Sequence, residues 1–527
     1  MRNTTDNNEL NRRSSQSEVV IDGDVVIKNG EQRSRSNSTY SADLETAITK
    51  TGCGKFSIAL MLLTFPAACT LGFDTASMSF IIPAASVDLG LKPSERALLQ
   101  SSCYAGIISG GILWGFMSDA FGRKKFMVIG FLINALMNIL IGAFRIVPLM
   151  IVFKYLAGFT ISGSYPIFST YIAEIFPIKR RDIIIMSLGF HASIGQIIQS
   201  SLAMWIMPID VPSEIPFKSW QLFQMACCLP ALISGISCIF FVESPKFLAD
   251  KGNHEGALKV CQTIYSINTG NLSTSYPVKR LNHESRKIEN KSNLSKFLEG
   301  IDVLRPPFVQ KAVVVFLLYL GFIVSYNILR LWLPDMLTLI SSSKLNPNQG
   351  LCPLLQEGEL RRRMLTSSED LNDEKVYSQM IWVNVVGLIG QILFLLLIRY
   401  IGKKIMQFSC TLMAAICSLI MLYISADYVM IVASIYMALY EICVYSTLNI
   451  ALEIFPTRIR ASSIGIMMLI GKSGTFTMNF LMATLGYTYC IYLFYGIALF
   501  SIIMAGLTLL IPKKPLEDKL CNPSKGN

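Results

Sequence analysis

Twelve long apolar segments limit the folds open to this chain more than any other feature. Each approaches or exceeds the ~20 residues that a helix needs to cross ~30 Å of hydrocarbon. Backbone polar groups inside a bilayer must bond within the chain, so such segments predict membrane-spanning helices. The segments lie at about 56–82, 97–118, 125–144, 149–172, 183–207, 220–242, 311–333, 376–399, 404–424, 428–452, 460–483 and 488–511.

The composition supports the same class of protein. Of 527 residues, 52% are hydrophobic and 15% are charged, whereas a soluble protein carries about 25% charged residues. The net charge of +11 would suit nucleic acid, but Lys and Arg gather in the short predicted loops, as they do on the cytoplasmic side of membrane proteins. We therefore expect a lipid bilayer and no nucleic acid as partner.

Two sequence patterns recur in the second half of the chain at nearly the same separation. Glu174 begins Glu-Ile-Phe-Pro, which returns at Glu453, and Gly122-Arg-Lys-Lys is echoed by Gly402-Lys-Lys. Two unrelated patterns at one offset indicate duplicated halves. Paired halves around a midplane site are common in membrane transporters. The expected fold is an all-α membrane protein of twelve helices in two pseudo-symmetric six-helix bundles.

The polar segments set the expected domain boundaries. Basic short loops place both termini and the central linker in the cytoplasm. The bundles are expected at 56–242 and 311–511, and the second includes an exterior loop at 334–375. The remaining ranges are a disordered tail at 1–55, a cytoplasmic linker at 243–310 and a short cytosolic tail at 512–527.

The cysteines suggest neither a metal site nor a redox motif. Most lie in or beside apolar segments, where Cys behaves as a small hydrophobe. Cys352 alone falls in a predicted exterior loop, so we expect it to lack a disulfide partner.

The loop after the second segment carries a distinctive motif. Its spacing is Gly-x3-Asp-x2-Gly-Arg-Lys, with Asp119, Gly122 and Arg123 at the later positions. Gly122 permits a tight turn, and Arg123 can reach a carboxylate on a neighbouring helix. The motif resembles the signature loop of the major facilitator superfamily. That resemblance implies alternating access, with this loop helping to close a cytoplasmic gate.

Glu174 and Glu453 end their predicted helices on the same side. Proline stops each helix, and a basic stretch follows, so each carboxylate can pair with a base such as Arg123 or Lys403. In the second half Arg399 replaces the acid of the motif, which predicts an asymmetric gate. The full expected gate set is Asp119, Gly122, Arg123, Glu174, Arg181, Arg399, Lys403, Glu453 and Arg460.

A narrower resemblance covers residues 50–512. Ser162-Gly-Ser-Tyr-Pro-Ile-Phe-Ser-Thr-Tyr-Ile-Ala-Glu is similar to the fourth helix of the synaptic vesicle glycoprotein 2 group, and Glu243-Ser-Pro-Lys-Phe is similar to that group and to organic ion transporters. The synaptic vesicle proteins carry a large glycosylated luminal domain between helices 7 and 8. Only about forty residues stand there in this chain, so no function of that domain is carried over.

Charged residues inside membrane segments are costly and need a reason. Asp74, Glu441 and Lys472 lie well inside their segments. Lys472 could bind an anionic group of a solute, it could pair with Glu441, or Glu441 and Asp74 could load and release protons. The resemblance implies a cationic residue at the place of Lys472. Arg330 and Lys154 are expected near exterior helix ends, where their side chains can snorkel to the interface.

The expected cavity combines these charges with aromatic and amide side chains. Its residues are Asp74, Tyr165, Gln196, Tyr326, Glu441, Asn449 and Lys472. The sequence favours a secondary transporter of a small organic ion or polar metabolite, with or without a coupling ion. It predicts no enzyme, metal or cofactor. The alternative is a transporter-like vesicle membrane protein with a regulatory or trafficking role, and the expected location is the plasma membrane or a vesicle membrane.

Overall fold

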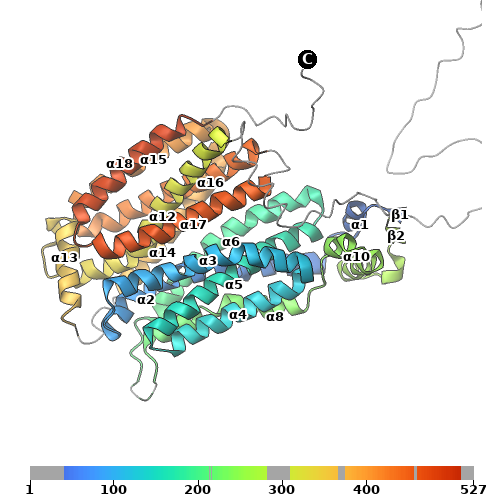
Figure 1. Cartoon of the computed structure of the whole chain (residues 1–527), viewed down its shortest axis with the longest axis horizontal. Helices are drawn as coiled ribbons and strands as arrows, with labels where there is room; N and C mark the ends of the chain where they lie inside the picture. Colours follow the sequence, from blue (N-terminus) through green and yellow to red (C-terminus); the bar gives the residue numbers. More distant parts are fainter. Residues whose placement is uncertain are drawn as a thin grey trace, which may run out of the picture. The chain divides into compact units, whose positions relative to one another are not determined.

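The computed structural model describes residues 41–212, 214, 216–281, 309–365, 374–455 and 460–511. Over these ranges the chain is helical apart from short connections and two strands of two residues each (Figure 1). Ten helices of the described ranges, with α7 and α8 counted together, are long and apolar enough to cross a membrane. Two further helices, α3 and α6, fill the remaining predicted positions, so an all-α membrane fold is confirmed.

The first six predicted segments form the N-bundle, α2 to α8. The segment predicted at 220–242 divides into two helices, because Cys227 ends the first and Pro230 fits only the first turn of the next. The helices are α2 (Lys55–Asp88), α3 (Pro93–Phe121), α4 (Arg123–Ala143), α5 (Val147–Ile175), α6 (Ile178–Ile206), α7 (Ser219–Ala226) and α8 (Leu229–Ile239).

The other six segments form the C-bundle. Its first helix runs on to Ser342, beyond the predicted end, so the connection predicted to be exterior is shorter than expected. The helices are α12 (Val309–Ser342), α14 (Glu374–Ile401), α15 (Lys403–Tyr423), α16 (Ala426–Ile454), α17 (Arg460–Leu485) and α18 (Cys490–Thr508).

Equivalent helices pack together in the two bundles. In the N-bundle the main pairs are α2 with α6, α3 with α5, α4 with α5 and α4 with α8. The C-bundle repeats them as α12 with α17, α14 with α16, α15 with α16 and α15 with α18. The bundles meet through α2 with α12, α3 with α17 and α6 with α14. Each half therefore contributes its first, second and fifth membrane helices to the interface.

Small residues allow the closest contact in the N-bundle, between α3 and α5. A Cβ on Gly106 would lie 2.0 Å from the carbonyl oxygen of Tyr155, and one on Gly158 would lie 2.1 Å from that of Cys103. Glycines at these positions let the two backbones touch, as small-x3-small patterns do in membranes.

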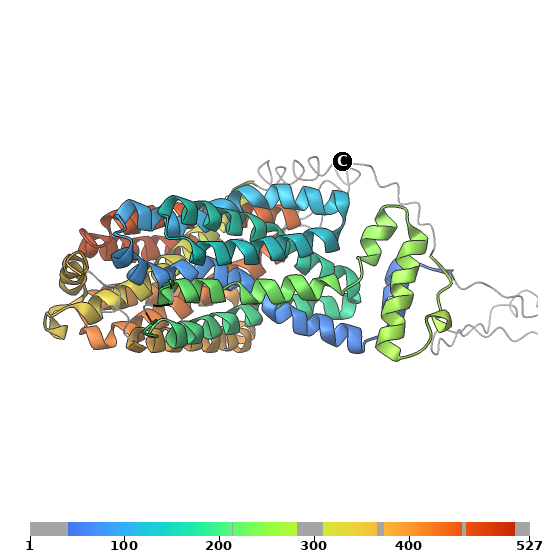
Figure 2. The same ribbon diagram turned by 90° about the horizontal axis from the view of Figure 1, so that it is seen from below.

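A linker subdomain, residues 41–54 and 245–281, lies beside the N-bundle. In Figure 2, α10 runs across the ends of the membrane helices. Ala47, Ile48 and Cys261 are buried in its core, and Asn268 accepts bonds from the first free N–H groups of α2. Its elements are β1 (Ser41–Ala42), α1 (Leu44–Lys50), α9 (Pro245–Asp250), α10 (His254–Thr269), η1 (Ser273–Ser275) and β2 (Arg280–Leu281), with β1 parallel to β2.

This subdomain corrects part of the expected disordered tail. Residues 41–54 are ordered, because Asp43 caps α1 and the apolar face of α1 packs on α10. Residues 1–40, also assigned to that tail, and 512–527 lie outside the described ranges.

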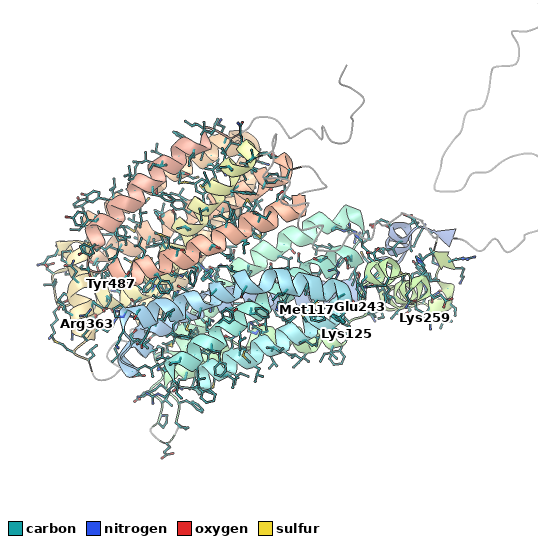
Figure 3. The ribbon with its side chains drawn as sticks, in the orientation of Figure 1. Met117, Lys125, Glu243, Lys259, Arg363 and Tyr487 are labelled. Atoms are coloured by element: carbon teal, nitrogen blue, oxygen red, sulfur yellow. A yellow bond between two sulfur atoms is a disulfide. The ribbon has the colours of Figure 1, made fainter. Side chains whose placement is uncertain are left out.

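A disulfide joins Cys352 to Cys490, so the expectation that Cys352 lacks a partner was wrong. Cys490 falls inside the apolar segment predicted at 488–511, but it is the first residue of α18 and so lies at the end of that helix. Cys352 lies in α13 (Leu351–Arg362), which follows η3 (Pro347–Gln349). We call this the disulfide end, and the end that carries Arg123 and Glu174 the linker end. Figure 3 labels Arg363 and Tyr487 at the former, and Lys125 and Glu243 toward the latter.

Candidate functional site

A small pocket lies between the bundles. It is lined by helices α6, α12, α14 and α16, so both halves contribute. Three lining residues, Gln196, Tyr326 and Glu441, belong to the cavity set expected from the sequence. The full lining is Ser193, Gln196, Tyr326, Val383, Asn384, Gly387, Leu388, Met437 and Glu441.

Glu441 supplies the carboxylate of this pocket. Gln391 Nε2 donates to its Oε1 at 2.6 Å and lies 2.5 Å from Ser193 Oγ on the N-bundle. A Cβ on Gly387 would lie 2.9 Å from Glu441 Oε2, so the glycine leaves room for the carboxylate against α14. One amide thus connects the buried acid to the opposite bundle.

Arg330 lies deep in the interface, and the expectation that it snorkels was wrong. It is 8% exposed, because α12 continues for about 18 Å beyond it at 1.5 Å per residue. Its Nε donates to Gln196 Oε1 at 3.2 Å and its Nη2 to Thr75 Oγ1 at 3.4 Å. Both acceptors are neutral and both belong to the N-bundle. The guanidinium also lies 5.9 Å from the centre of the Tyr326 ring.

Lys472 does not pair with Glu441 among the described residues. Its Nζ lies 5.4 Å from the ring centre of Tyr104 on α3, an arrangement typical of a cation–π contact. Lys472 and Arg330 are close enough to interact electrostatically. In place of the expected Lys472–Glu441 pair, Lys472 has an aromatic partner and a neighbouring cation, and it is Arg330 that interacts electrostatically with Glu441.

Asp74 lies inside the N-bundle and away from the pocket lining. It is 1% exposed and accepts hydrogen bonds from Asn134 Nδ2 at 2.5 Å and Asn138 Nδ2 at 2.7 Å. Lys154 interacts with it electrostatically and donates to Ser77 Oγ at 2.8 Å. Lys154 is also 1% exposed, so its expected snorkelling was wrong. Its position allows it to balance the buried acid.

Two expected cavity residues make other contacts. Asn449 donates to the carbonyl of Tyr445, one turn earlier on its own helix. Tyr165 packs against the apolar core of the N-bundle. Neither belongs to the pocket lining.

At the linker end, Arg123 pairs with Glu174 as the sequence suggested. Its Nη2 lies 3.0 Å from Glu174 Oε1, and Ser244 Oγ donates to Glu174 Oε2 at 2.6 Å. Glu243 accepts from the backbone N–H of Lys124 at 3.0 Å and so caps α4, where a carboxylate suits the helix dipole. Gly122 precedes α4 with a φ of 118°, a conformation that disfavours other residues.

The remaining expected gate residues divide into two groups. Lys403 pairs with Glu453, and Arg181 lies 3.3 Å from Glu45 of the linker subdomain. The side chains of Asp119, Arg399 and Arg460 lie outside the described part of the structure. The Arg123–Glu174 and Lys403–Glu453 pairs each stay within one bundle, so their role in a gate remains a prediction.

Sequence reasoning missed several residues that the structure brings together. The apolar pattern placed Arg330 at a helix end, and it did not single out Gln391. For both Arg330 and Gln391, the available sequence signal was a polar side chain inside an apolar segment. The role of Glu243 and Ser244 at the linker end was also missed, although their motif had been recognised.

The helix arrangement and the motif at Gly122 agree with the sequence comparisons. Residues 64–351, more than half of the chain, match the Major Facilitator Superfamily. The chain belongs to this superfamily. It is thus a multi-pass membrane protein of a transporter family and not an enzyme.

Curated relatives within the superfamily include synaptic vesicle glycoproteins. The chain is 24% identical over 337 residues to synaptic vesicle glycoprotein 2B of Rattus norvegicus, covering 58% of this chain and 49% of the relative. It is 28% identical over 242 residues to synaptic vesicle glycoprotein 2C of Mus musculus, covering 45% and 33%. The chain thus matches half or less of these relatives, and the relationship is distant.

The fold is similar to that of a solved bacterial transporter of the superfamily. The inward open conformation of the xylose transporter XylE from E. coli aligns with a TM-score of 0.64 at 17% identity, covering 88% of this chain and 97% of that one. The partially occluded inward open conformation aligns with a TM-score of 0.62, also at 17% identity, covering 86% and 98%. At this identity the likeness concerns the fold alone.

Proposed function

We propose that this protein is a secondary transporter that moves a small organic anion by alternating access. One observation carries the choice of an anion: Arg330 and Lys472 are neighbouring cations at the bundle interface, and their hydrogen-bond and ring partners among the described residues are neutral, although Glu441 lies within electrostatic range of Arg330. Like charges repel strongly where water is scarce. An anionic group between them would relieve that repulsion.

The pocket supports a solute with a second, polar part. Gln196, Asn384 and Glu441 offer hydrogen-bonding groups beside Tyr326 and Leu388. Ligand sites combine an apolar wall with a few fixed polar groups in this way. A small amphipathic anion would place its charge near Arg330 and its remainder along this wall.

We propose that the linker end faces the cytoplasm. The disulfide supports this orientation, because disulfides persist in oxidising surroundings and Cys352–Cys490 lies at the opposite end from the basic loops. The plasma membrane and a vesicle membrane fit equally well. Asp74 and Glu441 are the candidates for carrying a coupling proton.

Uptake into proteoliposomes tests the proposal. A panel of labelled organic anions, cations and neutral polyols is compared in the parent and in Lys472→Gln and Arg330→Gln. We expect saturable uptake of an anion, and each variant should raise KM or lower uptake by about tenfold or more, the effect of losing one charged contact to a ligand. Arg145→Gln is the matched control, because Arg145 is an exposed cation between α4 and α5.

Two outcomes would overturn the proposal. Uptake of cations that survives both substitutions would remove the argument for an anion site. Failure to take up any compound, together with altered vesicle cargo on deletion of residues 1–40, would favour the regulatory or trafficking role instead.

A further inference from the structure

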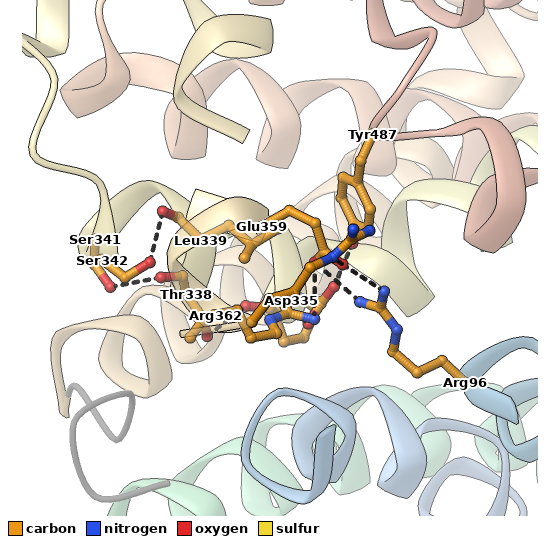
Figure 4. Close-up of polar contacts among 11 residues, drawn as sticks. Arg96, Asp335, Thr338, Leu339, Ser341, Ser342, Glu359, Arg362 and Tyr487 are labelled. Carbon is orange, nitrogen blue, oxygen red and sulfur yellow. Dashed lines mark hydrogen bonds and ion pairs between the residues drawn. The ribbon is translucent and has the colours of Figure 1, made fainter. Parts of the chain in front are cut away.

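Five polar side chains form a buried cluster at the disulfide end (Figure 4). They come from α3, α12, α13 and the turn before α18. Arg96 is 3% exposed, and both carboxylates of the cluster are buried. The members are Arg96, Asp335, Glu359, Arg362 and Tyr487.

Arg96 connects the N-bundle to this cluster through a bidentate ion pair. Its Nη2 lies 2.7 Å from Glu359 Oε1 and its Nη1 lies 3.1 Å from Glu359 Oε2. Two parallel bonds between a guanidinium and a carboxylate give strength and fixed geometry. The guanidinium also lies 5.9 Å from the centre of the Tyr487 ring.

The partners of Arg96 are fixed within the C-bundle. Arg362 Nη2 lies 2.6 Å from Asp335 Oδ1, which ties α13 to α12. The hydroxyl of Tyr487 donates to Asp335, and the disulfide ties α13 to α18. Helix α13 therefore moves with the C-bundle and holds Glu359 toward Arg96.

The linker end is arranged differently. Among its described ion pairs, Arg123–Glu174 and Lys403–Glu453 each lie within one bundle, and Arg181–Glu45 joins the N-bundle to the linker subdomain. The Arg96–Glu359 pair instead crosses the interface, and beside it Gln100 Nε2 donates to the carbonyl of Leu331 at 3.3 Å. Rigid-body rocking of the bundles would leave the linker-end pairs intact and would change the distance between Arg96 and Glu359.

We propose that Arg96 and Glu359 form a charged latch that holds the disulfide end closed and separates when the cavity opens to that end. Burial favours the paired state, because the buried Arg96 guanidinium would lose its carboxylate partner on leaving. Glu359 would keep Arg362 at 3.5 Å and Arg363 at 3.7 Å. Once that end opens to water, both charges regain hydration. The latch therefore favours two end states over intermediate ones.

Distances between spin labels on the two bundles test the latch without a known solute. One pair replaces Ser94 and Asn348, which are exposed at the disulfide end, and a second replaces Lys125 and Ile405 at the linker end. The protein lacks its free cysteines, keeps its disulfide and is held in lipid nanodiscs. We expect Arg96→Ala and Glu359→Gln to increase the long-distance population at the disulfide end by about tenfold. The linker-end distance should shorten in the same variants.

Glu357→Gln is the matched control. Glu357 lies on the same helix, but it contacts Ser343 and Lys344 of its own bundle, so it should leave both distances unchanged. Arg96→Gln should open the end in the same way, which keeps the test valid if Arg96→Ala does not fold. Parent-like distances in folded Glu359→Gln, or opening by Glu357→Gln, would overturn the latch.

Discussion

Three cations in the membrane-spanning part of the protein, two of them buried and Lys472 partly buried, have three kinds of partner. Lys154 lies beside Asp74 and its two amide donors. Lys472 lies over the ring of Tyr104, and Arg330 donates to two neutral oxygens. A buried charge is costly unless it is paired. Lys154 therefore fits a structural role, whereas the other two have capacity left for a ligand.

Replacing Lys154 should destabilise the N-bundle. Lys154→Met leaves Asp74 buried with amide partners alone, and breaking a buried pair costs about 3 kcal/mol. Thermal unfolding of the purified protein should show the loss, and Asp74→Asn combined with Lys154→Met should recover part of it. Lys125→Met, at an exposed site, is the control. If Lys154→Met is as stable as the parent, Lys154 does not have a structural role.

The contact between α3 and α5 gives a second prediction at this scale. Gly106→Ala should lower stability, because its Cβ would lie 2.0 Å from a backbone oxygen that cannot move without shifting α5. Gly111→Ala on the same helix is the control, since no atom lies within 4 Å of a Cβ there, and it should gain up to about 1 kcal/mol from helix propensity. Equal changes in thermal stability for Gly106→Ala and Gly111→Ala would contradict the close approach of α3 and α5.

The sequence predicted some of these positions and misplaced others. Gln196, Tyr326 and Glu441 were expected in one cavity, and they line one pocket. Arg330 was misplaced because apolar periodicity does not show where a helix ends, and α12 runs on to Ser342. The choice of partner for Lys472 depends on helix rotation, which the linear pattern does not contain. That choice required the tertiary structure.

At the scale of elements, twelve apolar segments predicted twelve helical positions, including the break between the halves. The shorter elements were not predicted, because their sequences are polar or show only weak apolar periodicity. Helices α10 and α13 bury only one face each, and the strands β1 and β2 have two residues. Segments of this kind gain most of their stability from tertiary contacts.

The packing of α10 predicts a difference in thiol reactivity. Burial raises the pKa of the Cys261 thiol to about 12, so the reactive thiolate is scarce at neutral pH. Cys53, in the same subdomain, is exposed. We expect N-ethylmaleimide to label Cys53 and to spare Cys261 until the protein is unfolded, with mass spectrometry of the peptides as the readout. Equal labelling in the folded protein would mean that α1 does not cover α10.

For the whole molecule, the two bundles should assemble even when they are separate chains. The largest apolar cluster includes residues of both, such as Phe80 of α2 and Phe322 of α12. Co-expressed halves divided after residue 295 should therefore co-purify through a tag on either one. Each half expressed alone is the control and should give less folded protein. Retrieval of only the tagged half would mean that the interface depends on the covalent link.

The disulfide turns most of the C-bundle into a closed ring. The bond spans 138 residues and encloses α14, α15, α16 and α17. A protease that cuts once anywhere inside this ring leaves a single covalent molecule. Nicked protein should therefore run as one species on a denaturing gel without reductant and as two fragments with it. The half that carries Lys472 and Glu441 can thus be cleaved at one peptide bond without releasing a fragment.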